Sequence, residues 1–186
     1  LVAFGGAPFT LASYLVEGGP SQDLPTSRWL MAHEPETWAA VLEWCAQITA
    51  AFISAQVESG ASVYQVFDSW AGKLDPAEYR RFAKPHSTSL FQQLRHLRDE
   101  RGRQIPGIHF GLHTGPILSD MLEVGASAMG VDHTMSLVEA NRIFAGAVPL
   151  QGNIHVDMLT APWEQLRNHI DQVLRDGLEA PGHVVN

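Results

Sequence analysis

Short apolar runs alternate along the chain with longer segments in which apolar residues recur at helical spacing. The short runs predict strands at residues 1–4, 62–67, 107–110, 128–131, 148–150 and 183–185. The periodic segments predict helices at residues 9–17, 36–59, 76–82, 85–101, 117–124, 137–145 and 162–176. Strands that are apolar throughout and alternate with helices are typical of a parallel sheet covered by helices, an α/β fold.

A repeated phrase in the sequence supports this organisation. Residues 58–62 and 123–127 both run from a glutamate through a glycine to Ala-Ser, and each precedes a strand that ends at an aspartate. A looser copy precedes the strand at 148–150. The phrase predicts repeated βα units, and six strands are two short of a closed (β/α)₈ barrel. An open Rossmann-type sheet is the alternative, but no Gly-x-Gly-x-x-Gly motif follows any strand.

The first strand leads into a glycine-containing turn and a short helix. Gly5 and Gly6 allow a sharp turn, and Pro8 suits the first position of a helix. Gly18-Gly19 can supply the left-handed residue that ends this helix. Tyr14 lies on the helix one turn beyond Thr10, so we expect its hydroxyl to point toward the carboxyl end of the strand, where α/β folds place their chemistry.

Polar residues just after the strands should converge on one rim of such a sheet. This rule selects Tyr14, Asp68, Ser69, His113, Asp132, His133, Gln151, Asn153 and His155. For Asp132 and Asn153, capping a helix or fixing a loop is the alternative role. Asp68 is a candidate for orienting Ser69 and its loop. The sequence leaves open whether the histidines line a site or lie exposed in loops.

Composition excludes several functional classes. The formal charge of −8 and the isoelectric point near 5.5 argue against a nucleic-acid partner. Cys45 is the single cysteine, which excludes an internal disulfide and fits a reducing compartment. No signal peptide or membrane-spanning run is recognisable, so we expect a cytoplasmic protein. Because the chain begins and stops inside strand-like runs and lacks an initiator methionine, we expect it to be one truncated domain, residues 1–186.

The segment 36–59 is the longest predicted helix. Val41, Trp44, Ile48, Phe52 and Val57 recur along it near helical spacing, and its aromatic residues are predicted to lie in the core. Cys45 should be a small buried hydrophobic residue on the same helix. The basic residues at positions 80, 81, 84, 95, 98, 101 and 103 should form a solvated outer face.

The chain offers little for metal or nucleophilic catalysis. His109 and His113 have helical i,i+4 spacing, but His109 lies in a predicted strand that runs into a loop. No Ser-His-Asp order, nucleophile elbow or phosphate-binding loop is present. We therefore expect neither a metal site nor a catalytic nucleophile.

Several blocks resemble the uroporphyrinogen decarboxylases of haem biosynthesis in order and spacing. They are Phe4-Gly5-Gly6-Ala7-Pro8-Phe9-Thr10, Tyr14-Leu15-Val16-Glu17-Gly18-Gly19, Gln65-Val66-Phe67-Asp68-Ser69-Trp70-Ala71-Gly72, Gly130-Val131-Asp132 and Leu150-Gln151-Gly152-Asn153. The resemblance implies a TIM barrel with two further strands upstream. The chain departs from the family pattern at His133 and at Ile154-His155-Val156, both in predicted rim loops.

The resemblance also implies an activity. It implies cofactor-free removal of the carboxylates from the four acetate arms of uroporphyrinogen III, giving coproporphyrinogen III. The matching tyrosine and serine of the family contact acidic side chains of the tetrapyrrole, so the same role is implied for Tyr14 and Ser69. The family's arginine-rich loop and central aspartate precede residue 1, and a histidine follows residue 186. The chain should therefore carry half a site, be inactive alone, and form a homodimer when full length.

Two other functions remain as alternatives. A corrinoid-dependent methyltransferase of the same fold would bind zinc through a His-x-Cys pair, but Gly111 stands at the second position here. A non-catalytic relative that binds a tetrapyrrole would lack the upstream arginines and aspartate.

Overall fold

The structure is a computed structural model that describes residues 1–186. Its strands are β1 (Val2–Gly6), β2 (Val63–Phe67), β3 (Gly107–Phe110), β4 (Ala128–Gly130), β5 (Leu150–Gln151) and β6 (His183–Val184). They form one sheet in sequence order, and every neighbouring pair is parallel. All six strands coincide with predicted ones, which confirms the α/β class.

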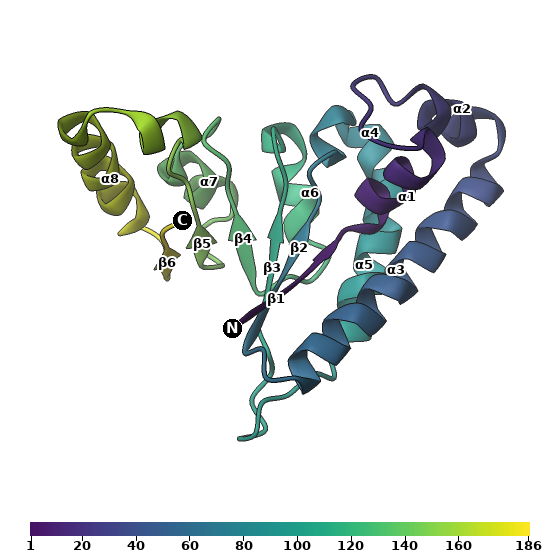
Figure 1. Cartoon of the computed structure of the whole chain (residues 1–186), viewed down its shortest axis with the longest axis horizontal. Coiled ribbons are helices and arrows are strands. Elements are labelled where there is room, and N and C mark those ends of the chain that lie inside the picture. The colour runs from purple at the N-terminus through teal and green to yellow at the C-terminus, as the bar shows by residue number, and fades with distance from the viewer.

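Helices separate consecutive strands. They are α1 (Pro8–Glu17), α2 (Pro25–His33), α3 (Pro35–Glu58), α4 (Pro76–Glu78), α5 (Lys84–Leu94), α6 (Leu118–Leu122), α7 (Leu137–Ile143) and α8 (Trp163–Gly177). Short 3₁₀ segments are η1 (Ala71–Lys73), η3 (Gly115–Ile117) and η4 (Val156–Thr160), and η2 (Tyr79–Ala83) is π-helical. Figure 1 shows the strands in the middle, with α3 and α5 at one end of the sheet and α8 at the other.

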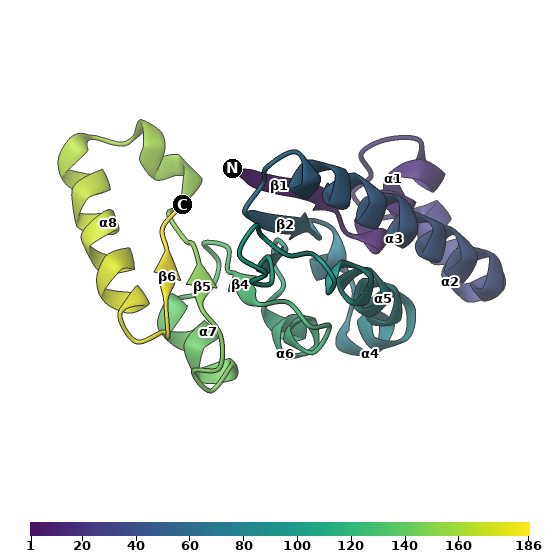
Figure 2. The ribbon, with the colours of Figure 1, turned by 90° about the horizontal axis from the view of Figure 1, so that it is seen from below.

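The sheet is curved, with its concave side free of helices. Gln65 on β2 and Gln151 on β5 are three strand steps apart, about 14 Å in a flat sheet. Yet Gln151 Nε2 donates a hydrogen bond to Gln65 Oε1 at 3.2 Å, which requires the two side chains to converge from a curved surface. Figure 2 shows the helices arranged around the outside of this curve. The architecture is that of a partial (β/α)₈ barrel.

The predicted helix ends are present, but the sharp turn expected at Gly5 and Gly6 is not, because both glycines lie inside strand β1 and neither has a positive φ. Pro8 stands in the first turn of α1, and Gly18 ends this helix at φ +75°, with its N–H bonded to the Tyr14 carbonyl. The glycines of the repeated phrase, Gly60 and Gly125, both have strongly positive φ, 107° and 102°. Only glycine adopts this backbone conformation at little cost, so the repeat marks equivalent turns from helix to strand.

The prediction for the buried face of α3 was right for Trp38 but wrong for Trp44, Ile48 and Phe52. Its core side chains are Trp38, Leu42, Cys45, Ala46, Thr49, Ala50 and Ile53. Trp44, Ile48 and Phe52 are each about half exposed, at 55%, 50% and 52%. The helix is apolar on more than one face, so helical spacing alone could not say which face meets the sheet. Cys45, only 1% exposed, is buried as expected.

Two helix predictions also need correction. The helix predicted at 85–101 ends at Leu94, and an antiparallel bridge between Arg98 and Gln104 follows. Asp99 stabilises this turn by accepting hydrogen bonds from the backbone N–H groups of Arg101 and Arg103. Helix α2 was not predicted, because its residues 25–33 are mostly polar or exposed and show little apolar periodicity.

Candidate functional site

The carboxyl ends of β1 and β2 place two hydroxyl-bearing residues at one rim. Gly6 and Phe67 are paired in register, and the backbone N–H of Ala7 donates to the Phe67 carbonyl at 2.8 Å. Tyr14 lies on the helix that follows β1, and Ser69 lies in the loop that follows β2. Tyr14 is 39% exposed and Ser69 is half-buried. The structure thus places both side chains at the same end of the sheet, open to solvent.

An aromatic stack joins the two positions. The Tyr14 ring lies on the Trp70 ring, with centroids 4.1 Å apart and planes 28° from parallel. Trp70 directly follows Ser69 and is buried. Offset stacking of this kind restrains both rings. The orientation of Tyr14 is therefore coupled to the loop that carries Ser69.

A hydrogen-bonded relay beneath the rim holds this loop. Thr10 Oγ1 donates to Asp68 Oδ1 at 2.9 Å and accepts the backbone N–H of Trp70 at 3.2 Å. Asp68 is fully buried, and its own backbone N–H donates to the Phe110 carbonyl at 2.6 Å. Asp68 therefore orients the Ser69 loop, as the sequence suggested. Thr10 was not foreseen, although its position one helical turn before Tyr14 was a usable signal.

Two of the predicted rim residues have structural roles. Asp132 accepts hydrogen bonds from the His113 backbone N–H at 2.7 Å and from both the N–H and hydroxyl of Thr134. Asn153 Nδ2 donates to the backbone carbonyls of Asp132 and Met135. Asp132 and Asn153 therefore fix the rim loops, which is the alternative role that the sequence left open for both residues.

One of the predicted histidines, His133, lines a cavity of about 310 Å³ at the ends of β3, β4 and β5. Its lining includes Phe110, His133 and Asn153. The His133 and His155 rings meet edge to face with centroids 4.1 Å apart. His113 is mostly exposed and lies 3.9 Å from the Asp132 carboxylate. The cavity is therefore a mainly apolar hollow with the His133 imidazole in its wall.

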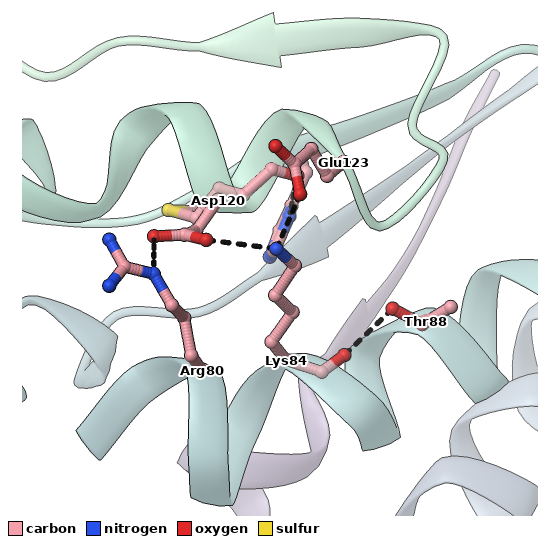
Figure 3. A network of polar contacts seen from close by, with 7 residues as sticks. Arg80, Lys84, Thr88, Asp120 and Glu123 are labelled. Carbon is pink, nitrogen blue, oxygen red and sulfur yellow. Dashed lines mark hydrogen bonds and ion pairs between the residues drawn. The ribbon is translucent and has the colours of Figure 1, made fainter. Parts of the chain in front are cut away.

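A network of ion pairs links η2 and α5 to α6 (Figure 3). Arg80 and Lys84 donate to the two oxygens of Asp120 at 2.9 and 2.8 Å, and Lys84 also contacts Glu123. The hydrogen bond to Asp120, then that to Glu123, raises the pKa of Lys84. Burial would raise the pKa of Asp120, but the hydrogen bonds from Lys84 and Arg80 outweigh it and lower that pKa. The network corrects the prediction that all these basic residues form a merely solvated face.

No group of three or more His, Cys, Asp or Glu side chains is arranged to hold a metal ion. Helix α3 is long and apolar enough to cross a membrane by length and composition alone. However, it packs through Trp38, Leu42 and Ile53 into the core, and core helices of globular proteins pass the same test. It is not a convincing membrane span.

These features define an α/β protein of the barrel class whose strand-end rim presents a phenol and a serine hydroxyl. A family model described as uroporphyrinogen decarboxylase (URO-D) matches residues 1–186. The chain belongs to the uroporphyrinogen decarboxylase family.

Individual relatives agree with this assignment. The chain is 48% identical to the uroporphyrinogen decarboxylase of Arthrobacter sp. (strain FB24) and 44% identical to that of Thermus thermophilus. Both matches cover 100% of this chain and 52% of the relative, so the chain spans about half the length of these curated relatives. A methyltransferase from Methanosarcina mazei superposes with a TM-score of 0.81 over 99% of this chain and 51% of that chain. At 19% identity, this likeness concerns the fold alone.

Proposed function

We propose that residues 1–186 form the part of a uroporphyrinogen decarboxylase that holds acidic arms of the substrate through Tyr14 and Ser69. The observation that carries this proposal is the pair of hydroxyls at one rim, coupled by the Tyr14–Trp70 stack. Neither hydroxyl forms a hydrogen bond within the chain, so both are free to donate to a carboxylate.

The reaction assigned by this proposal is decarboxylation of the four acetate arms of uroporphyrinogen III to give coproporphyrinogen III. A proton added to a pyrrole carbon makes the ring an electron sink. The bond between the arm and its carboxylate then breaks, its electron pair enters the ring, and carbon dioxide leaves. A proton then adds to the carbon that carried the carboxylate, and the first proton leaves the pyrrole carbon, so the net change at each arm is one proton taken from solvent and one carbon dioxide released. Tyr14 and Ser69 would hold and orient an arm, so their contribution is positioning.

The charge at the rim indicates that these residues supply only part of the site. Gripping many carboxylates calls for arginines, and stabilising a positive ring calls for a nearby carboxylate. Lys73, the basic residue after the β2 rim, donates to the Gln22 carbonyl instead of facing the cavity. Asp68 and Asp132 are buried and hydrogen-bonded. We therefore propose that the remaining groups come from segments outside residues 1–186.

Exposed apolar surface supports the proposal of one truncated barrel domain. Val2 and Phe4 on the edge strand β1 are 50% and 56% exposed. Phe52 on α3 packs against Phe4, edge to face at 6.2 Å, and Trp44 and Ile48 lie exposed on the same helix. Contiguous apolar surface of this kind is normally covered, and further βα units would cover it. Homodimerisation of the longer protein and a cytoplasmic location complete the proposal, and family membership supports both.

The methyltransferase alternative gains no support. The structural neighbour of that name shares only the fold, and Gly111 offers no side chain to a zinc ion. A tetrapyrrole-binding relative without activity would lack the upstream arginines and aspartate, so only an assay of the longer protein separates it from the enzyme.

The test is binding of uroporphyrin III, the stable oxidised form of the substrate, to the chain and its variants. Tyr14→Phe and Ser69→Ala should each weaken binding about tenfold, because each removes a hydrogen bond to a charged group worth about 1.5 kcal/mol. Ser62→Ala is the matched control, since Ser62 lies at the opposite end of β2. Equal binding by all four proteins would refute the proposed contacts.

The half-site proposal is tested by assaying uroporphyrinogen III decarboxylation directly. The Arthrobacter relative, which is about twice as long, is the positive control. We expect no turnover by residues 1–186. Measurable turnover by this chain alone would refute the proposal that the site needs further segments.

A further inference from the structure

A buried pair of ionisable side chains lies directly beneath the rim. His109 is on β3, next to β2, and its Nε2 atom lies 3.6 Å from Oδ2 of Asp68. Both side chains are completely buried. Neither of these two atoms has a hydrogen-bond partner elsewhere in the protein. The proposed function assigns no role to His109.

The hydrogen bonds of the imidazole determine how many protons it needs. Nδ1 of His109 lies 3.4 Å from the Met121 carbonyl oxygen, which can only accept, so this contact is a hydrogen bond when Nδ1 carries the hydrogen. A neutral imidazole has only one N–H group, and Nε2 would then present a lone pair to the Asp68 carboxylate. Two acceptors facing each other without water would both remain unsatisfied, which is costly in a buried site. A proton on Nε2 removes this conflict.

The surrounding groups leave His109 as the counter-ion of Asp68. Tyr79 of η2 lies close by, but burial first, and then the charges of Asp68 and Asp120, raise its pKa well above the ordinary value. Tyr79 therefore stays a neutral phenol. Ser87 of α5 contacts that phenol and carries no charge, and the Phe91 ring packs on the imidazole at 5.3 Å. Arg80 and Lys84 are already paired with Asp120.

We propose that His109 is a positioning residue that holds a proton against Asp68 and, through the Thr10 relay, fixes the Tyr14–Trp70 stack at the rim. The path runs from His109 to Asp68, from Asp68 Oδ1 to the Thr10 hydroxyl, and from that hydroxyl to the Trp70 backbone N–H. The effect of His109 on substrate binding rests on the proposed function. The effect of His109 on the Tyr14–Trp70 stack does not depend on that function.

The protonation state can be measured directly on the unmodified chain. Nitrogen-15 NMR of the imidazole rings should show hydrogens on both nitrogens of His109 at neutral pH. A His109→Gln variant assigns the resonance. A lone pair on either nitrogen of His109 would overturn the proposal, whatever the variants do.

The positioning role is tested with His109→Gln and a matched control, His86→Gln. His86 also faces a carboxylate, that of Glu43 at 3.4 Å, but this pair joins α5 to α3 and is partly exposed, at 16% and 39%. The readout is the near-ultraviolet circular dichroism of the Tyr14–Trp70 stack, identified by its loss in Trp70→Phe. We expect His109→Gln to lose most of this signal well below its unfolding temperature, and His86→Gln to keep it.

A second substitution separates positioning from general damage to the core. In Asp68→Asn/His109→Gln, the asparagine oxygen can still accept from Thr10 while its amide donates to the glutamine oxygen. This double variant should recover the stack signal, and should recover uroporphyrin III affinity from about a tenfold loss in His109→Gln. A full stack signal in His109→Gln, or no recovery in the double variant, would overturn the inference. If Tyr14→Phe binds uroporphyrin III as tightly as the unmodified chain, the proposed function fails while the stack measurement still decides the role of His109.

Discussion

Replacing Thr10 by valine is the sharpest perturbation of the rim. The Thr10 hydroxyl is the only link between the Asp68 carboxylate and the backbone of the loop that carries Ser69 and Trp70. Valine has nearly the same shape, so the substitution removes the two hydrogen bonds without opening a cavity in this buried site. Both groups that lose their partner lie out of reach of solvent.

The expected cost follows from these two losses. A hydrogen bond to a charged group contributes about 1.5–3 kcal/mol, and a buried N–H without a partner costs about 1–3 kcal/mol. The loop will relax in part, so we expect Thr10→Val to lower the free energy of unfolding by about 2–4 kcal/mol. For a domain of this size, a loss of 3 kcal/mol corresponds to a fall of about 6–12 °C in Tm.

Urea denaturation followed by far-ultraviolet circular dichroism measures this loss, provided that the m-value is unchanged. Thr10→Ser is the control: it keeps the hydroxyl and should cost only about 1 kcal/mol for the lost methyl group. The near-ultraviolet signal of the Tyr14–Trp70 stack should weaken in Thr10→Val and persist in Thr10→Ser. If Thr10→Val unfolds within 0.5 kcal/mol (roughly the measurement error) of the unmodified chain, the relay does not hold the loop.

Three further predictions concern other parts of the molecule. Lys84→Met should lower stability by about 1–3 kcal/mol near neutral pH. Because folding lowers the pKa of Asp120 and raises that of Lys84, the difference from the unmodified chain should shrink as pH falls below about 3.8 or rises above about 10.5, which pH-dependent urea titrations check. Gly72→Ala should cost about 1–3 kcal/mol in the same assay, because its Cβ would overlap the Leu112 carbonyl oxygen. Burial raises the pKa of Cys45 to about 11, so a thiol reagent at mildly alkaline pH should label it only at the rate of unfolding; fast labelling in native buffer would contradict its burial.

The strands were predictable because a buried parallel strand must be apolar on both faces, which gives a short uninterrupted signal. The buried face of a helix was harder to predict than the position of a strand. On α3, large aromatic residues suggested one buried face, whereas small residues such as Ala46 and Ala50 mark the face that packs against the sheet and α5. Close packing selects small side chains where elements approach, and hydrophobicity alone does not record that selection.

The rim was predictable to the level of strand ends and no further. Tyr14 and Ser69 could be placed at one edge because parallel strands share a direction. The relay depends on the sheet register, which sets His109 opposite Val66 and so close to Asp68. Register is a tertiary property of two segments far apart in sequence. The i,i+4 spacing of His109 and His113 instead drew attention to a metal ligand pair that the strand geometry separates.

The distribution of polar groups at the rim has a consequence for how a polyanion could bind there. The carboxylates of Asp68 and Asp132 are buried and accept hydrogen bonds from the protein, so the acidic chain does not present them to a ligand. The Tyr14 phenol and the Ser69 hydroxyl are free to meet a ligand, and both are neutral groups. A neutral donor orients a carboxylate without the strong, salt-sensitive attraction of an arginine. Affinity of residues 1–186 for uroporphyrin III should therefore depend only weakly on ionic strength, and a steep salt dependence would mean that cationic side chains of this chain, and not these hydroxyls, make the contact.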